Sequence, residues 1–317
     1  MPISQSGIIV IWVVFLDVNM RELTEKHRIA GSFDSRMADI GDVNLDQLHQ
    51  LSVSVRWPHR AEDWQFLRSV GQGVVALDNI DRVLGSAMWF PFGETVATIG
   101  MVITSPRLQE NGTAQWLVQH ILDQCGDREM RVNTPPNVRR FFKSLGFSQT
   151  RSISQFQGHV SLRPTEVERP SHSDVRELSP EDLDAAAALD AVAFGDDRSG
   201  LLKQLFNEGQ GFGIFQADRL RAFAVSRSFG RGWVIGPIVA FTESEAMALV
   251  ARHMEKRDRQ FLRVDTIFTG GAFADLLIAN GLVPVGDVVT MVRSPRKKAT
   301  GAADNPMTFA LASHTLG

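Results

Sequence analysis

The chain has 317 residues, which at roughly 150 residues per domain corresponds to about two domains. Its 44% hydrophobic and 22% charged residues are typical of a globular protein, and a formal net charge of −3 gives no reason to expect a nucleic acid partner. The single cysteine, Cys125, excludes an intrachain disulfide and a zinc site made of several cysteines, and the absence of tyrosine excludes a phenolic proton donor. We therefore expect a protein of a reducing, cytoplasmic compartment.

The strongly apolar run near the N-terminus covers residues 7–16. It is shorter than the roughly 20 apolar residues that a transmembrane helix needs, and no positive charge precedes it as in a secretory signal. An extra strand, a start codon placed too early with Met20 as the true start, and a membrane or export role are the open interpretations. We treat residues 1–30 as an N-terminal extension and expect no membrane partner.

Residues 31–160 alternate between helical and strand periodicity. The pattern predicts, in this order, a helix over 44–53 capped by Asp42 or Asn44, a strand pair at 74–77 and 83–90, a long strand over 96–104, a helix over 112–124, a strand over 130–133 and a helix over 137–145.

Residues 175–317 repeat this order more faintly. The pattern predicts a helix over 179–194, strands at 213–215 and 221–226, a strand over 233–239, a helix over 244–256, a strand over 261–267, a helix over 273–280 and a C-terminal strand over 307–311. Residues 161–174 are rich in proline and serine and are predicted to form a linker, and the basic residues 293–298 a solvated loop.

One stretch has the residues of an anion site. Residues 103–114 read I-T-S-P-R-L-Q-E-N-G-T-A, between a predicted strand and a predicted helix. A glycine turn entering a helix presents backbone N–H groups at the positive end of the helix dipole, which favours pyrophosphate. The alternative is merely a tight strand-to-helix connection. The stretch lacks G-x-G-x-x-G and Gly-Lys-Ser/Thr, which disfavours dinucleotides and nucleoside triphosphates.

Gln109, Gly112 and Ala114 form a Gln-x-x-Gly-x-Ala pattern, and Asn137 precedes Phe141-Phe142-x-x-x-Gly146-Phe147. With these two motifs, residues 33–158 resemble the GNAT superfamily of acetyl-CoA-dependent N-acetyltransferases. The second half resembles a degenerate copy, as in tandem GNAT proteins, because no such loop follows Gly236-Pro237. The resemblance implies an α/β (α+β) fold of two domains, 31–160 and 175–317, each a mixed, mostly antiparallel sheet flanked by helices.

The resemblance also implies roles for particular residues, with acetyl-CoA as co-substrate in the first domain alone. The backbone of Met101, Val102 and Ile103 would pair with the pantetheine arm, and Lys143 would reach a phosphate. Asn137 and Phe141 would line the thioester end, although Phe141 fits core packing equally well. The pyrophosphate would be held by Gln109, Glu110, Asn111, Gly112, Thr113 and Ala114.

In this family the acceptor-binding loop follows the first helix, where residues 56–64 read R-W-P-H-R-A-E-D-W. Arg56, Trp57, His59 and Trp64 are therefore candidates for binding a cationic or aromatic acceptor. The alternative is that the tryptophans anchor the loop while His59 makes a structural hydrogen bond. His59 and Glu94 are candidate proton acceptors, and Asp265 could face the cleft between the domains. No third ligand joins His120 and Cys125, so we expect no metal.

These features predict an N-acyltransferase that moves an acetyl group directly from the thioester to a small-molecule amine rather than to a protein. The family's usual tyrosine acid is replaced by Phe142. Either another residue or a water supplies that proton, or the chain is a non-catalytic acyl-CoA-binding sensor. We expect a monomer or a homodimer.

Overall fold

The computed structural model describes residues 27–30, 33–106, 112–162, 174–296 and 305–317. The apolar run at 7–16, most of the predicted linker, and Gln109, Glu110 and Asn111 lie outside these ranges. Within them, no helix is long and apolar enough to cross a membrane.

The strands of the described ranges form one continuous mixed sheet, in the order β1-β2-β3-β4-β5-β6-β13-β7-β12-β14-β11-β10-β9-β8. Neighbours in this order are antiparallel except for β5 and β6, which are parallel, and β11 and β12 also pair directly, in parallel, over part of their length. The first half contributes β1 (His27–Ala30), β2 (Phe33–Asp39), β3 (Gln72–Leu77), β4 (Val83–Phe92), β5 (Val96–Thr104), β6 (Glu129–Thr134) and β7 (Ser148–His159). The second half contributes β8 (Asp174–Glu177), β9 (Gln210–Gln216), β10 (Arg219–Phe229), β11 (Gly232–Ala240), β12 (Phe261–Thr266), β13 (Val283–Arg293) and β14 (Met307–Ala310).

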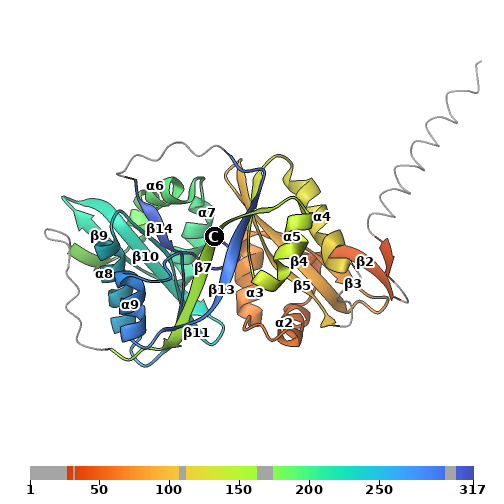
Figure 1. Cartoon of the computed structure of the whole chain (residues 1–317), viewed down its shortest axis with the longest axis horizontal. Helices are drawn as coiled ribbons and strands as arrows, with labels where there is room; N and C mark the ends of the chain where they lie inside the picture. The colour runs from red at the N-terminus through yellow and green to blue at the C-terminus, as the bar shows by residue number, and fades with distance from the viewer. Residues whose placement is uncertain (1–26, 31–32, 107–111, 163–173, 297–304) are drawn as a thin grey trace, which may run out of the picture.

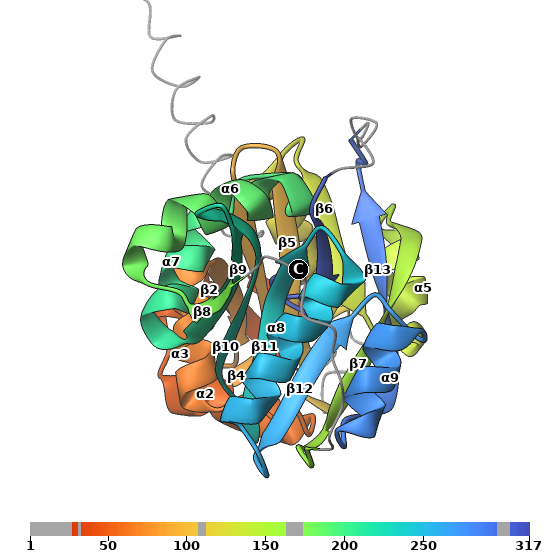
Figure 2. The same ribbon diagram turned by 90° about the vertical axis from the view of Figure 1, so that its left-hand side faces the viewer.

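Helices pack on this sheet in both halves (Figure 1). They are α2 (Leu45–Ser54), α3 (Ala61–Val70), α4 (Thr113–Cys125), α5 (Arg139–Ser144), α6 (Leu183–Phe194), α7 (Ser199–Glu208), α8 (Glu243–Lys256) and α9 (Ala272–Ala279), with short 3-10 turns at Ile40–Asp42, Pro136–Val138 and Pro180–Asp182. Figure 2 looks onto the second half, where α8 lies in front of β10 and β11 and packs on both.

The two halves exchange a strand where they meet. β6 does not pair with β7, which follows it in the chain, but with β13 from the second half. β7 in turn lies between β13 and β12, both from the second half. Figure 1 shows β7 and β13 running side by side at the middle of the molecule. The sheet is therefore continuous through the junction, and neither half closes its own sheet.

Apolar packing joins the halves as well. One cluster contains Trp64, Phe66 and Leu67 of α3 together with Leu201, Leu202 and Leu205 of α7 and Phe223 of β10. Two further clusters lie under α4 in the first half and under α8 and α9 in the second. Burial at the junction is thus of the kind found inside a domain rather than between loosely connected domains.

Most elements lie where the sequence predicts them, and α3 is the clearest correction. Residues 56–64 were interpreted as one loop, but a helix begins at Ala61, because the Asp63 carboxylate in its first turn accepts a hydrogen bond from the Arg60 backbone N–H. The helix α7 and the strands β7 and β13 were also missed. The long outer part of β13, Val283 to Asp287, is exposed and lacks the apolar alternation of a half-buried strand.

Candidate active site

Strands β5 and β6 pair only over their N-terminal parts. Their pairing covers Val96–Ile99 and Glu129–Val132 and does not continue beyond these residues. There β5 carries a bulge, at which Met101 adopts a φ of 51°, a left-handed conformation that is uncommon outside glycine. The Ser86 hydroxyl donates a hydrogen bond of 2.7 Å to the Met101 carbonyl and holds this conformation. The two strands therefore diverge and leave a wedge between them.

A cavity of about 690 Å³ fills this wedge and extends to the second half of the chain. The first half supplies residues of β5 and β6, of α5 and of the connection between α2 and α3. The second half supplies Phe229, Arg231, Trp233, Phe261 and Arg263, and the end of the chain supplies Ser313, His314 and Thr315. Its volume is in the range typical of small-molecule sites.

Several residues expected at the acetyl-CoA site line the cavity. Met101, Val102 and Ile103 do so from β5, and Ala114 from the first turn of α4. Gly112 precedes this helix with a φ of 73°, which a residue with a side chain adopts only with strain. Thr113 is buried in the same turn. The rest of the predicted pyrophosphate loop lies outside the described residues.

The second motif contributes to the same wall. Asn137 and Phe141 line the cavity, whereas Lys143 is exposed on α5 and is not among the lining residues. Phe142 also lines it and is only 2% exposed, with its ring packed edge-on to Phe141 at 5.0 Å and Phe147 at 5.5 Å. The position of the family's usual acid thus presents only an apolar ring.

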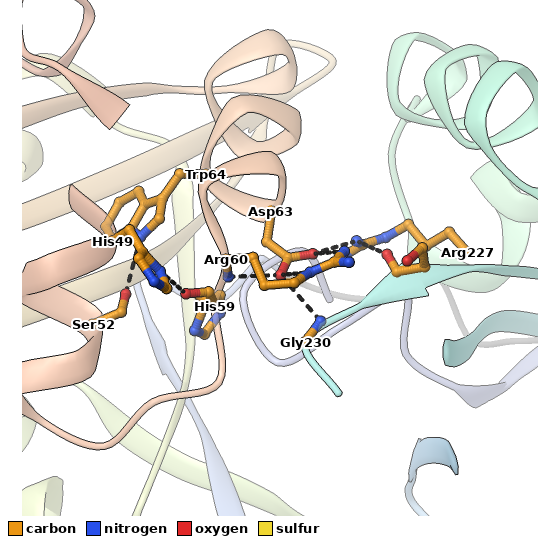
Figure 3. Close-up of polar contacts among 9 residues, drawn as sticks. His49, Ser52, His59, Arg60, Asp63, Trp64, Arg227 and Gly230 are labelled. Carbon is orange, nitrogen blue, oxygen red and sulfur yellow. Dashed lines mark hydrogen bonds and ion pairs between the residues drawn. The ribbon is translucent and has the colours of Figure 1, made fainter. Parts of the chain in front are cut away.

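The connection between α2 and α3 forms the opposite side. Arg56 is exposed with a φ of 60°, and it lines the cavity with Trp57 and His59. The imidazole of His59 is surrounded by the rings of Trp57 at 5.6 Å, Trp64 at 6.4 Å and Phe229 at 5.2 Å. Its backbone carbonyl accepts a hydrogen bond of 2.9 Å from His49 Nδ1 (Figure 3).

Burial among these rings lowers the pKa of His59 to about 3, because the charged imidazolium would be desolvated there. Its Nδ1 is buried without a hydrogen-bond partner. A ring with so low a pKa is a weak proton acceptor at neutral pH. The second candidate, Glu94, is exposed in the turn between β4 and β5 and is not among the residues that line the cavity.

Trp64 lies in the core rather than in the cavity. It is fully buried, and its Nε1 donates a hydrogen bond of 2.9 Å to Ser52 Oγ on α2 (Figure 3). Its place in α3 therefore supports the anchoring role that the sequence left open for the tryptophans.

Asp63 connects this region to the second half. Its carboxylate accepts hydrogen bonds from the Arg60 backbone N–H at 2.8 Å and from the Gly230 N–H at 3.0 Å, and it lies 3.9 Å from Arg227 (Figure 3). Burial opposes the charged form of Asp63, but the hydrogen bonds from the Arg60 guanidinium, at 3.1 Å to each oxygen, and from the two backbone N–H groups together outweigh it and lower the pKa. Desolvation lowers the pKa of the buried Arg227 to about 10. The contact holds the turn between β10 and β11 against α3.

A polar pair from the second half lies behind the cavity wall. Asp265 is fully buried on β12, and Arg263 donates to both of its oxygens at 2.9 Å. His314 Nε2 lies 3.2 Å from Asp265 Oδ1, and the His314 side chain is 21% exposed and lines the cavity. The sequence placed Asp265 near the cleft, but no pattern distinguished His314, because its position depends on the path of the chain after β14.

His120 and Cys125 both belong to α4. Across the described ranges, no group of three or more His, Cys, Asp or Glu side chains is arranged to hold a metal ion. Cys125 is buried, and desolvation raises the pKa of its thiol to about 11.

Comparison with known proteins gives matches over both halves. Residues 44–147 match the model described as "Acetyltransferase (GNAT) family", and residues 186–302 match the one described as "Acetyltransferase (GNAT) domain". Together these matches cover more than half of the chain. The chain is also 25% identical over 166 residues to "Uncharacterized N-acetyltransferase YitH" of Bacillus subtilis, an alignment that covers 51% of this chain and 57% of that relative.

Solved structures show the same fold. "A Putative Acetyltransferase" from Pyrococcus horikoshii aligns with a TM-score of 0.72 at 16% identity, covering 92% of this chain and 98% of that one. A tandem GNAT protein from the clavulanic acid biosynthesis pathway aligns with a TM-score of 0.57 at 13% identity, covering 83% and 100%. At these identities the similarity concerns the fold alone.

Proposed function

Since the chain belongs to the GNAT superfamily of acetyltransferases and contains two such domains, we propose that it transfers an acetyl group from acetyl-CoA to the amine of a small molecule. The observation that supports this most is the wedge between β5 and β6, together with the cavity that fills it. An edge of β5 without strand pairing offers backbone groups to which an amide-containing arm can add like a strand.

The arm of the donor fits this wedge. Pantetheine carries two amide groups, and we propose that the backbone of Met101, Val102 and Ile103 binds them. Ala114 lines the cavity from the first turn of α4, where the helix dipole favours the negative charge of a pyrophosphate. The thioester would then lie deeper in the wedge, near Asn137 and Phe141.

The acceptor would lie between the two halves, against Trp57, Phe229 and Trp233. The described residues that line the cavity include Arg56, Arg231 and Arg263 but no aspartate or glutamate. Such a lining repels a polycation, so we expect an acceptor with an apolar or aromatic body and, apart from its reacting amine, no positive charge. A cavity of this size favours a small molecule over a protein side chain.

Transfer would be direct, by attack of the amine nitrogen on the thioester carbonyl. Positioning of the two reactants and polarisation of the carbonyl by backbone N–H groups of β5 would supply most of the rate enhancement. We also propose that the protein works in the cytoplasm, where its single buried thiol is compatible with reducing conditions.

A non-catalytic acyl-CoA sensor is the second candidate, and the apolar Phe142 favours it. Thiolate is nevertheless a good leaving group, with a thiol pKa of about 8.5, so its protonation by the protein is not obligatory. Turnover distinguishes the two functions.

The test uses the purified chain with acetyl-CoA and a pool of small amines, and measures CoA thiol release together with CoA binding by calorimetry. We expect thiol release that depends on amine, and Ala114→Trp should weaken CoA binding by more than roughly tenfold, about 1.4 kcal/mol. Gln115→Trp, at the next and exposed position of α4, is the matched control. CoA binding without turnover would favour the sensor, and unchanged CoA affinity in Ala114→Trp would contradict the placement of the donor.

A further inference from the structure

The segment after β14 passes across the mouth of the wedge. The Thr98 hydroxyl of β5 donates a hydrogen bond of 2.8 Å to the Thr315 carbonyl, and Asn133 Nδ2 of β6 donates one of 2.9 Å to the His314 carbonyl. A Cβ added to Gly100 would lie 2.3 Å from Thr315 Cγ2, so only glycine allows so close an approach. The segment is thus held on both strands at the point where they diverge.

These contacts place His314 in the cavity wall where the donor and acceptor would meet. One side of the ring faces a negative charge, because Nε2 lies 3.2 Å from the buried carboxylate of Asp265. The Asp265 carboxylate is itself held by two hydrogen bonds from Arg263. A carboxylate beside Nε2 favours the tautomer with its hydrogen on that nitrogen, which leaves Nδ1 with a free lone pair.

Charged and titratable groups face this ring from two neighbouring elements among the described residues. Asp265 and Arg263 face it from β12, and His59 faces it from the connection between α2 and α3. Asp265 is anionic, because Arg263 and His314 hold its pKa well below the ordinary value despite burial. The His314 ring thus lies against an anionic carboxylate, whereas the His59 ring is buried among aromatic rings.

We propose that His314, oriented by Asp265, takes the proton from the acceptor amine. The inference rests on the proposed function. The ammonium of the acceptor gives one proton to the imidazole, and the freed nitrogen lone pair attacks the thioester carbonyl carbon. As the new C–N bond forms and the C–S bond breaks, the second proton passes from nitrogen to the CoA sulfur. The products are the amide, the CoA thiol and a proton that the imidazolium releases to solvent.

In this reaction Asp265 is a positioning residue, since it acts through the imidazole rather than on the substrate. The second half of the chain then supplies the acid–base group for a donor bound in the first half. Of the sequence-based candidates, His59 lines the cavity but has a pKa of about 3, and Glu94 is not among the lining residues.

The experiment compares kcat, KM and CoA affinity of the full-length wild type, His314→Ala, His314→Gln and Asp265→Asn, with acetyl-CoA and the best amine of the pool. We expect His314→Ala to lower kcat by about 10²- to 10⁴-fold while CoA affinity stays within about twofold. Added imidazole should restore part of the His314→Ala activity, and Asp265→Asn should shift the pH profile of kcat/KM. His120→Gln, a histidine on α4 away from the cavity lining, is the matched control.

CoA affinity and thermal unfolding show which variants are folded. If His314→Ala is not folded, His314→Gln takes its place in the comparison. Wild-type turnover that both His314 variants retain would overturn this inference and leave the proposed function intact. Absence of turnover by the wild type would overturn both. A fall in kcat that imidazole does not relieve, with the pH profile unchanged, would make His314 a structural residue and contradict the inference.

Discussion

The ion pair between Asp190 and Arg198 gives the sharpest test of how the two halves are held. Both side chains are fully buried, and Arg198 donates to the two carboxylate oxygens at 2.9 and 2.7 Å. The same guanidinium donates to the carbonyl oxygen of Leu316 at 3.1 Å and to a main-chain oxygen of Gly317 at 2.7 Å. It therefore joins α6 and the start of α7 to the segment that carries His314.

Removing one partner leaves the other charge buried, which costs about 3–5 kcal/mol. At about 2–4 °C per kcal/mol for domains of about 150–250 residues, Asp190→Leu should lower the melting temperature by roughly 10 °C. In an Arg198→Met background, the effect of Asp190→Leu on the free energy of unfolding should have the opposite sign. There Asp190 is a buried carboxylate without its cation, and replacing it with leucine should recover about 1–3 kcal/mol.

The assay is urea and thermal unfolding of the wild type, both single variants and the double variant, followed by circular dichroism. Retention of the folded state at 25 °C is checked by CoA binding. A loss below about 1 kcal/mol for Asp190→Leu would refute the reasoning, because burial of a charge would then carry no penalty here. The reasoning would also be refuted if the double variant lost as much stability as the two single variants together, because the two side chains would then not be coupled.

Three further predictions follow from burial and topology. The pKa of Asp63 is lower in the folded state than its unfolded value of about 3.9, so the charged carboxylate stabilises the protein above that pH. In urea titrations, the stability advantage of the wild type over Asp63→Asn should therefore vanish as the pH falls below about 4. Cys125, with a pKa of about 11, should resist a thiol reagent at pH 8 by mass spectrometry until urea unfolds the chain, and rapid labelling of the native protein would contradict its burial. A fragment of residues 1–160 should fail to unfold cooperatively, because in it β6 loses its partner β13 and β7 loses both of its partners. A cooperative unfolding transition in a fragment that still binds CoA would show that the exchange of β7 and β13 between the halves is dispensable.

The sequence was sufficient for the local elements of the first half. Asn44 caps α2 through a hydrogen bond to Asp46, and β5 covers the predicted 96–104. Gly112 stands directly before α4, as a glycine turn into a helix requires. These features depend on a few adjacent residues, through capping, alternation and turn chemistry, and so they can be predicted without knowledge of the remainder of the chain.

The site could be predicted only in part, because its acceptor side is assembled from distant segments. Trp57 and His59 were identified from their position after the first helix, and they do line the cavity. The sequence did not identify Phe229, Trp233 and His314 as site residues, because each belongs to an element whose place depends on the exchange of β7 and β13. No local pattern encodes which of two similar antiparallel partners a strand will choose.

The second half contains the same diverging pair of strands, but there the opening is filled. β11 and β12 are paired only over Trp233–Ile235 and Leu262–Val264, and β14 then enters between them. Gly236 accommodates it, because an added Cβ would lie 1.8 Å from the Leu311 carbonyl oxygen. A strand of the chain itself thus occupies the place that we propose for the pantetheine arm in the first half, which is a physical reason to expect only one donor site. The residues that follow β14 continue to β5, so a single segment closes one wedge and brings His314 to the other.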